Sequence, residues 1–303
     1  MKPQNRAKLL LALSMAIFGT LAPFVRGISL TSAERALWRA VLAILLIGGF
    51  LLITKQPIPL RSIKRSLPLL LLSGMAMGLN WILLFEAYSY TTVSVATLSY
   101  YFAPVLVTVL CPLLFRERMT GKQILCFCMS TVGLCLVIGV GDLSGASSHL
   151  VGILFGLGAA VLYATVILLN KKIDGVDGIP RTFLQFLAAI LILVPYVLVQ
   201  GGNGLGSLDT TGWICLLIVG LLHTGLTYCM YFSSIKEMTG QSIAILSYLD
   251  PLVAILISVL VLRESITPLQ ILGGALILGF TLYNELGTKP KKQKKGIDHE
   301  ADR

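Results

Sequence analysis

The chain has 303 residues, of which 56% are hydrophobic and only 13% are charged. A soluble domain of this length cannot hide so much apolar side chain, so the composition excludes a water-soluble fold and predicts an all-α integral membrane protein. The net charge is +10. Because the basic residues lie in short loops and in one tail, this charge indicates membrane orientation and not nucleic-acid binding.

Apolar runs long enough to cross roughly 30 Å of hydrocarbon occur repeatedly along the chain. Turn residues and charges separate them, and no gap is large enough for a soluble domain. The chain is therefore predicted to have ten transmembrane helices. The predicted spans are 8–25, 34–54, 67–89, 92–115, 121–140, 150–170, 180–200, 211–234, 239–262 and 267–285.

The second half of the chain repeats the first at an offset of 147 positions. Over the 34 positions from 92 to 125, ten residues are identical to their counterparts, among them Tyr101 with Tyr248 and Pro104 with Pro251. Each half holds five spans, an odd number, so the two copies must face opposite sides as two inverted five-helix repeats. The predicted repeats are 1–145 and 146–287, followed by a basic tail at 288–303.

The distribution of charge predicts the orientation. With the N-terminus in the cytoplasm, 20 of the 24 Lys and Arg residues lie on the inner side and only Arg26, Arg35 and Arg263 lie on the outer side. This asymmetry predicts that both termini are cytoplasmic. The lysine-rich tail is then expected to lie against an anionic inner leaflet.

The stretch AYSYTTVSVATLSYYFAPVLVTVLCPLLFRERMTGKQIL, at 87–125, resembles the end of an EamA domain of the drug/metabolite transporter superfamily. The family shows an Ala-x-x-Tyr-Thr-like entry, a mid-helix Pro and an Arg-Glu-Arg-x-Thr turn. Residues 238–272 match the same pattern, and Arg39 lies where the family often has an Arg. The resemblance implies ten helices, a central substrate cavity and transport, often export, of small metabolites. The chain departs from the family at Phe18-Gly19, where many members have Trp-Gly.

Asp250 is the sharpest candidate for substrate binding or coupling. It lies near the middle of the predicted ninth span, where a charge costs a few kcal/mol even on insertion scales, so it should face a cavity or a partner. Its counterpart in the first repeat is Ala103. Asp250 is predicted to bind a substrate ammonium group or to take a coupling proton. The alternative is a structural ion pair with Arg39 or His223.

Two further polar residues lie inside predicted spans. His223 is at mid-depth in the eighth span, and since histidine titrates near neutral pH it suits a proton role; a hydrogen-bonded core histidine is the alternative. Arg39, in the second span, either binds a substrate carboxylate or pairs with Glu34 or Glu86.

Aromatic and amide side chains flank these positions. An aromatic ring with one polar atom suits a cavity that binds an organic molecule, although packing or lipid contact is the alternative. The further candidate binding residues are Tyr101, Tyr248, Trp81, Asn80 and Tyr228.

Two other sets of residues are matched between the repeats. Pro104 and Pro251 are predicted to kink the fourth and ninth helices, and corresponding interruptions in two halves point to the binding site. The helix-end pairs Arg116-Glu117 and Arg263-Glu264 are predicted to be structural locks between neighbouring helices.

Several kinds of chemistry leave no motif in the chain. A Walker loop, an HExxH motif and a lipase-type GxSxG motif do not occur, which excludes ATP-driven transport by this chain and predicts no enzyme and no cofactor. The six cysteines lie in apolar runs without CxxC spacing, so no metal site is predicted.

These features together predict a secondary transporter of the cell membrane. The predicted cargo is a small amphipathic metabolite, such as an amino acid or amine, exported by alternating access, with protons as the proposed coupling partner. An uncoupled facilitator is one alternative. A non-transporting membrane receptor or scaffold with the same fold is the other.

Overall fold

The computed structural model describes residues 3–55, 60–115, 120–138, 147–176, 178–202, 204–235, 238, 243 and 246–286. Within these ranges the backbone forms helices joined by turns and irregular loops, with no β-strand. The prediction of an all-α protein is therefore confirmed.

In the first half, two of the five spans consist of two helices each. Thr20 separates α1 from α2, and Tyr101 and Phe102 separate α5 from α6. The other three spans are single helices. The helices of this half are α1 (Pro3–Gly19), α2 (Leu21–Arg26), α3 (Ser32–Thr54), α4 (Leu60–Tyr90), α5 (Val93–Tyr100), α6 (Ala103–Phe115) and α7 (Gly121–Ile138).

In the second half, the eighth span changes its helical type along its length. It begins as α10 (Thr210–Leu217), widens into the π-helix η2 (Ile218–Leu226) and ends as α11 (Thr227–Ile235). The remaining long helices are α8 (Ser147–Asn170), α9 (Gly178–Val199), α13 (Leu249–Leu260) and α14 (Pro268–Leu286).

The helices account for the ten predicted spans. Seven described segments are long and apolar enough to cross a membrane, and three shorter apolar helices, at Gly121–Val137, Leu249–Leu260 and Pro268–Asn284, occupy the remaining predicted spans. Large apolar side chains face outward, with Leu52 81% and Val199 88% exposed. Such surfaces suit lipid, because the bilayer core offers apolar neighbours and no water.

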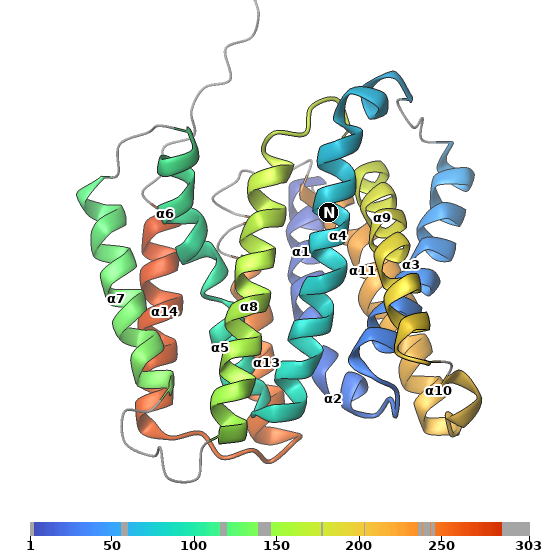
Figure 1. The fold of residues 1–303 in the computed structure, drawn as a ribbon. Helices are drawn as coiled ribbons and strands as arrows, with labels where there is room; N and C mark the ends of the chain where they lie inside the picture. Colours follow the sequence, from blue (N-terminus) through green and yellow to red (C-terminus); the bar gives the residue numbers. More distant parts are fainter. Residues whose placement is uncertain are drawn as a thin grey trace, which may run out of the picture.

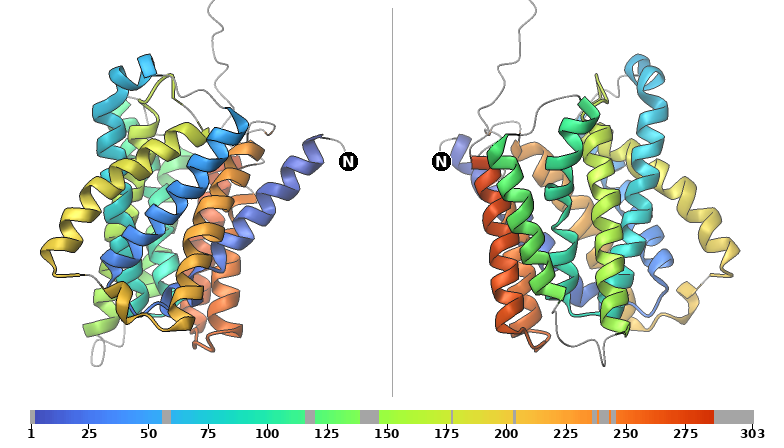
Figure 2. Two further views of the ribbon diagram at one scale, coloured as in Figure 1. Left: turned by 90° about the vertical axis from the view of Figure 1, so that its right-hand side faces the viewer. Right: turned by 60° about the vertical axis from the view of Figure 1, so that its left-hand side comes forward.

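The two halves cross the bundle in opposite directions (Figure 1). In that view α1 descends and α7 ends at the bottom, whereas α8 starts at the bottom and α14 ends at the top. We call these the lower end and the upper end. Both ends of the described chain lie toward the upper end, and Figure 2 shows α1 leaning away from the bundle toward its N-terminus.

The two repeats interleave and do not form separate bundles. α4 packs against α8 and α9, α3 packs against α9 and η2, and α7 packs against α14. Both main apolar cores contain residues from both halves of the chain. Small residues permit the close approach: a Cβ on Gly74 would lie 2.3 Å from the carbonyl oxygen of Gln185.

Gly133→Ala is expected to destabilise the protein, because α7 and α14 touch at this glycine. The added Cβ would lie 2.6 Å from the Gly273 carbonyl oxygen, so the helices must separate at a cost of about 1–3 kcal/mol. Thermal unfolding in detergent measures the loss. Gly49→Ala is the control, since its Cβ would meet no atom within 4 Å. Equal behaviour of the two variants would contradict the packing account.

Candidate functional site

The matched prolines lie at helix breaks. Pro104 is the second residue of α6 and Pro251 is the third residue of α13, so each lies in a first helical turn. A proline lacks the N–H that would continue the preceding helix, and its ring clashes with the carbonyl four residues earlier, whereas a first turn tolerates it. Instead of the predicted kink in a continuous helix, the fourth span is interrupted at Tyr101 and Phe102 and a turn at Tyr248 precedes α13.

The two interruptions are joined by a hydrogen bond. The Tyr101 hydroxyl donates to Oδ2 of Asp250 at 2.6 Å. Asp250 lies in the first turn of α13 and is half-buried, and no cation of the described residues lies within 4 Å of its carboxylate. The ion pair with Arg39 or His223, considered from the sequence, is therefore not formed. A tyrosine kept by both repeats meets a carboxylate found only in the second.

The break in the first span lies against the same place. α1 ends at Gly19, and a Cβ there would lie 2.6 Å from the carbonyl oxygen of Asp250 and 2.7 Å from Cβ of Val253. Only glycine allows this approach of the two backbones. Interrupted segments of the first, fourth and ninth spans therefore meet around Asp250, an arrangement that places irregular backbone at a buried site.

Arg39 is buried on α3, with 3% of its surface exposed. Its Nε donates to Oγ1 of Thr224 at 2.7 Å, and its guanidinium lies 4.6 Å from the ring centroid of Trp81. No carboxylate of the described residues lies within 4 Å of it. Glu34, one of the predicted partners, instead accepts the N–H groups of Thr31 and Gly204. The guanidinium is thus held by a hydroxyl and a ring, and its charge is not neutralised by an ion pair.

The π-helix η2 positions this arginine's partner. Its wider turns let the Thr224 hydroxyl donate to the Val219 carbonyl at 2.7 Å while it accepts from Arg39. Gly220 lies where a Cβ would come within 2.5 Å of Cβ of Leu42 on α3. π-Helical segments occur frequently at functional sites. Here the segment brings η2 and α3 together at the buried guanidinium.

Aromatic rings border each of the two charged groups. Trp81, which lies against Arg39, packs edge-on against Phe186, and Phe186 packs against Tyr228. Tyr100 packs against Tyr101 with ring centroids 5.9 Å apart. Aromatic side chains therefore border both the cation and the anion, Trp81 at Arg39 and Tyr101 at Asp250.

The other predicted binding residues have different surroundings. The His223 ring is buried, with Nε2 3.0 Å from the Thr20 hydroxyl and Nδ1 3.3 Å from the Ile218 carbonyl oxygen. Asn80 donates to the Ala159 carbonyl at 2.6 Å and so ties α4 to α8. Tyr248 is half-buried at the turn before α13. His223 and Asn80 hold elements together beside the site.

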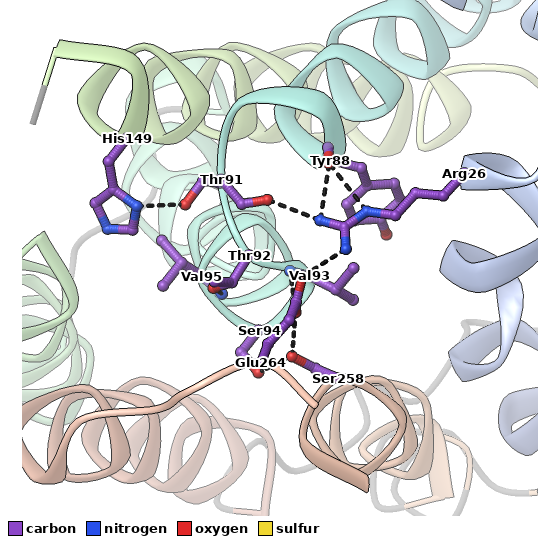
Figure 3. A network of polar contacts seen from close by, with 10 residues as sticks. All are labelled: Arg26, Tyr88, Thr91, Thr92, Val93, Ser94, Val95, His149, Ser258 and Glu264. Atoms are coloured by element: carbon purple, nitrogen blue, oxygen red, sulfur yellow. Dashed lines mark hydrogen bonds and ion pairs between the residues drawn. The ribbon is translucent and has the colours of Figure 1, made fainter. Parts of the chain in front are cut away.

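At the lower end, Arg26 links α4 to the loop after α13 (Figure 3). Its guanidinium donates to the carbonyls of Tyr88 and Thr91 at 2.9–3.1 Å and pairs with Glu264 at 2.5 Å. Glu264 also accepts the N–H of Val93, the first residue of α5, at 2.8 Å. A cation at the C-terminus of α4 and an anion at the N-terminus of α5 both suit the helix dipoles.

Two further contacts extend this lower-end network. Ser258 of α13 donates to Glu264 and accepts a hydrogen bond from Ser94 of α5 at 2.8 Å. The Thr91 hydroxyl lies 2.7 Å from Nδ1 of His149 on α8 (Figure 3). Segments of both repeats are therefore joined at this end.

The two residues of the predicted Arg263-Glu264 lock behave differently. Glu264 makes the contacts described above, whereas Arg263 is exposed in a left-handed conformation (φ 53°) with no hydrogen bond or ion pair to the described part of the chain. Arg116 and Glu117 lie outside the described residues.

Two features of the site have little signal in the sequence. Arg26 is one of three basic residues on the charge-poor side, which marks it as unusual but indicates no partner, and η2 follows no motif that separates it from an α-helix. The break at Thr20 does have a signal, because Pro23 follows it at the same spacing as Pro104 follows Tyr101. Within the described residues, no group of three or more His, Cys, Asp or Glu could hold a metal ion.

The sequence profile of the EamA-like transporter family matches residues 5–139 and 150–284. The chain belongs to this family. It is therefore a multi-pass membrane protein of a transporter family and not an enzyme, and each matched segment covers one five-span half.

Relatives of the chain carry transporter names. "Uncharacterized transporter YxxF" of Bacillus subtilis is 29% identical over 257 residues, which cover 84% of this chain and 82% of that protein. A "Probable amino-acid metabolite efflux pump" of Escherichia coli is 27% identical over 190 residues, 60% of this chain and 63% of that protein. "Threonine/homoserine exporter RhtA" of Escherichia coli is 25% identical over 174 residues, which cover 56% of this chain and 57% of that protein.

A solved crystal structure has the same fold. It superposes with a TM-score of 0.64 over 93% of this chain and 97% of its own length, at 14% sequence identity. At that identity the likeness concerns the fold alone.

Glu264→Ala is expected to destabilise the protein by about 2 kcal/mol, from the loss of a helix cap and of a partly exposed ion pair. Thermal unfolding in detergent measures the change. Arg263→Ala is the matched control, since its side chain is exposed and has no partner within the described ranges. A loss in the control as large as in the Glu264 variant would mean that the network does not stabilise the lower end.

Proposed function

We propose that the chain is a secondary transporter that exports a small amphipathic metabolite, with an amino acid or an amine as cargo, by alternating access. The observation that supports this most directly is the pair Arg39 and Asp250. Arg39 is held by the Thr224 hydroxyl and the Trp81 ring, Asp250 is held by the Tyr101 hydroxyl, and neither is ion-paired within the described residues. The names of the relatives, an amino-acid metabolite efflux pump and a threonine/homoserine exporter, point to the same class of cargo.

The charges favour a zwitterion. An unpaired charge inside a membrane protein is costly, so the site is stabilised when a ligand brings the opposite charges. Asp250 would bind the ammonium group and Arg39 the carboxylate. Trp81, Tyr101 and Tyr228 would surround the apolar part of the cargo, while Tyr248 lies at the turn that moves with α13.

Coupling to protons follows from the need to neutralise Asp250 when the cargo has left. A proton on the carboxylate would let the empty carrier change its conformation without a bare charge in the membrane. His223 is the less suitable proton carrier, because both of its ring nitrogens already have partners. An uncoupled facilitator is the alternative, and its flux would not respond to a pH gradient.

Alternating access requires the lower-end network to open. Arg26 and Glu264 join the two repeats there, so their separation would release the loop after α13 from α4 and α5. The charge asymmetry supports a cytoplasmic location for the upper end, where both ends of the described chain lie. In this orientation the network closes the outer side, and its opening releases the exported cargo.

Asp250→Asn is expected to abolish the response of transport to a pH gradient and to lower flux by about tenfold or more, because the amide neither binds a proton nor pairs with an ammonium group. Proteoliposomes that take up radiolabelled threonine and other amino acids, with and without a pH gradient, test this.

Asp209→Asn is the control for the Asp250 variant. Asp209 caps α10 through the Gly212 N–H, and asparagine caps equally well. Unchanged flux with an unchanged pH profile in Asp250→Asn would remove this residue from the mechanism. If uptake of the cargo by the unmodified protein does not change with the pH gradient, the uncoupled facilitator is favoured.

Arg39→Lys is expected to weaken binding of amino acids by about tenfold while sparing amines that lack a carboxylate. Lysine keeps the charge but loses the planar group that both bonds Thr224 and stacks on Trp81. Competition of unlabelled amino acids and their decarboxylated amines against labelled cargo measures the two affinities. Equal losses for both ligand types would show that Arg39 maintains the fold and does not read the carboxylate.

A further inference from the structure

An apolar groove lies between the last helices of the two repeats. It has a volume of about 380 Å³ and is lined by Leu125 of α7 and by Ala275, Gly279, Phe280 and Tyr283 of α14. Figures 1 and 2 show α7 and α14 side by side at one edge of the bundle. Leu125 and Tyr283 are each about half exposed, so the groove opens toward the surrounding lipid.

The groove is open because α14 has a glycine there. A Cβ on Gly279 would meet no atom within 4 Å. The lining residues of α14 run from 275 to 283, which corresponds to about 12 Å along the helix axis. This length suits a segment of one acyl chain.

Lys122 lies at the upper end of the groove, beside Tyr283. The Lys122 ammonium lies 4.3 Å from the ring centroid of Tyr283 and donates to the carbonyl of Asn284 at 3.2 Å. Among the side chains that the structure describes, which do not include that of Glu285, no carboxylate lies within 4 Å of it. An ammonium has three N–H groups, so the bond to Asn284 leaves donors on Lys122 for an anionic ligand.

The sequence next to these two helix ends is strongly basic. Arg116 and Arg118 precede α7, and five lysines follow α14 between positions 289 and 295, against Glu117 and Glu285 as the nearby acidic residues. The sequence segments next to the start of α7 and the end of α14 therefore carry an excess of positive charge. Such clusters beside a transmembrane helix attract anionic headgroups.

We propose that the α7–α14 groove binds one anionic phospholipid, with its phosphate at Lys122 and an acyl chain along 275–283. The apolar walls give the lipid a place that a free phosphate ion could not use. The bound lipid contacts the last helix of each repeat, so it bridges the two halves of the chain.

Thermal unfolding of the full-length protein in detergent, with native mass spectrometry of retained lipid, tests the proposal. Phosphatidylglycerol is expected to raise the unfolding temperature more than phosphatidylcholine with the same acyl chains. Lys122→Gln should weaken phosphatidylglycerol binding by about fivefold and remove the difference between the two lipids. Gly279→Leu, whose Cβ would meet no atom within 4 Å and whose side chain would extend into the groove, should reduce retention of phosphatidylglycerol. Lys64→Gln, at an exposed upper-end lysine outside the groove, is the matched control.

Four outcomes would overturn the proposal. Equal stabilisation by the two lipids would show that the headgroup is not recognised, and an equal effect of inorganic phosphate would show that no acyl chain is needed. Loss of binding only on removal of residues 288–303 would place the site on the tail. If Gly279→Leu changes the oligomeric mass of the protein but not its lipid binding, the groove holds a second copy of the chain and not a lipid.

Discussion

The missing N–H of two prolines is the constraint on which the rest of the site depends. Because Pro104 and Pro251 cannot continue a preceding helix, the backbone turns just before each of them and a new helix begins. Tyr101 and Asp250 lie at these interruptions and are hydrogen-bonded to each other. Since the prolines are matched between inverted repeats, two interruptions approach from opposite sides and meet inside the bundle, where Gly19 lets a third broken span join them.

The second constraint is the burial of an arginine without an acidic partner. Arg39 is satisfied by a threonine of the π-helix and by the face of Trp81. Both neighbours leave the positive charge in place, because neither a hydroxyl nor a ring neutralises it. By contrast, Glu264 at the lower end is surrounded by donors and neutralised by Arg26. The chain thus has one buried charge without an acidic partner among the described residues and one charge that joins the two repeats at the lower end.

The number of spans and the repeat could be predicted from sequence, because apolar run length and internal identity report them directly. Asp250 and Arg39 could be singled out, since charge inside an apolar run is rare. Their partners could not be predicted, because Tyr101 and Thr224 are 149 and 185 residues away along the chain. The prolines predicted kinks at their own positions, whereas the breaks lie two or three residues before each of them. The π-helix and the Arg26–Glu264 pair depend on packing between segments and leave no local pattern.

Interleaving of the repeats has a consequence for how the protein is made. The first half leaves the ribosome with the helix faces that will contact α8, α9 and η2 still without their protein neighbours. Arg39 has entered the bilayer before Thr224 has been synthesised, and Arg26 has done so before Glu264 exists. The early spans must therefore wait in lipid or against the insertion machinery. A gene divided between the two repeats would encode two products, each of which reaches its native packing only when the other is made beside it.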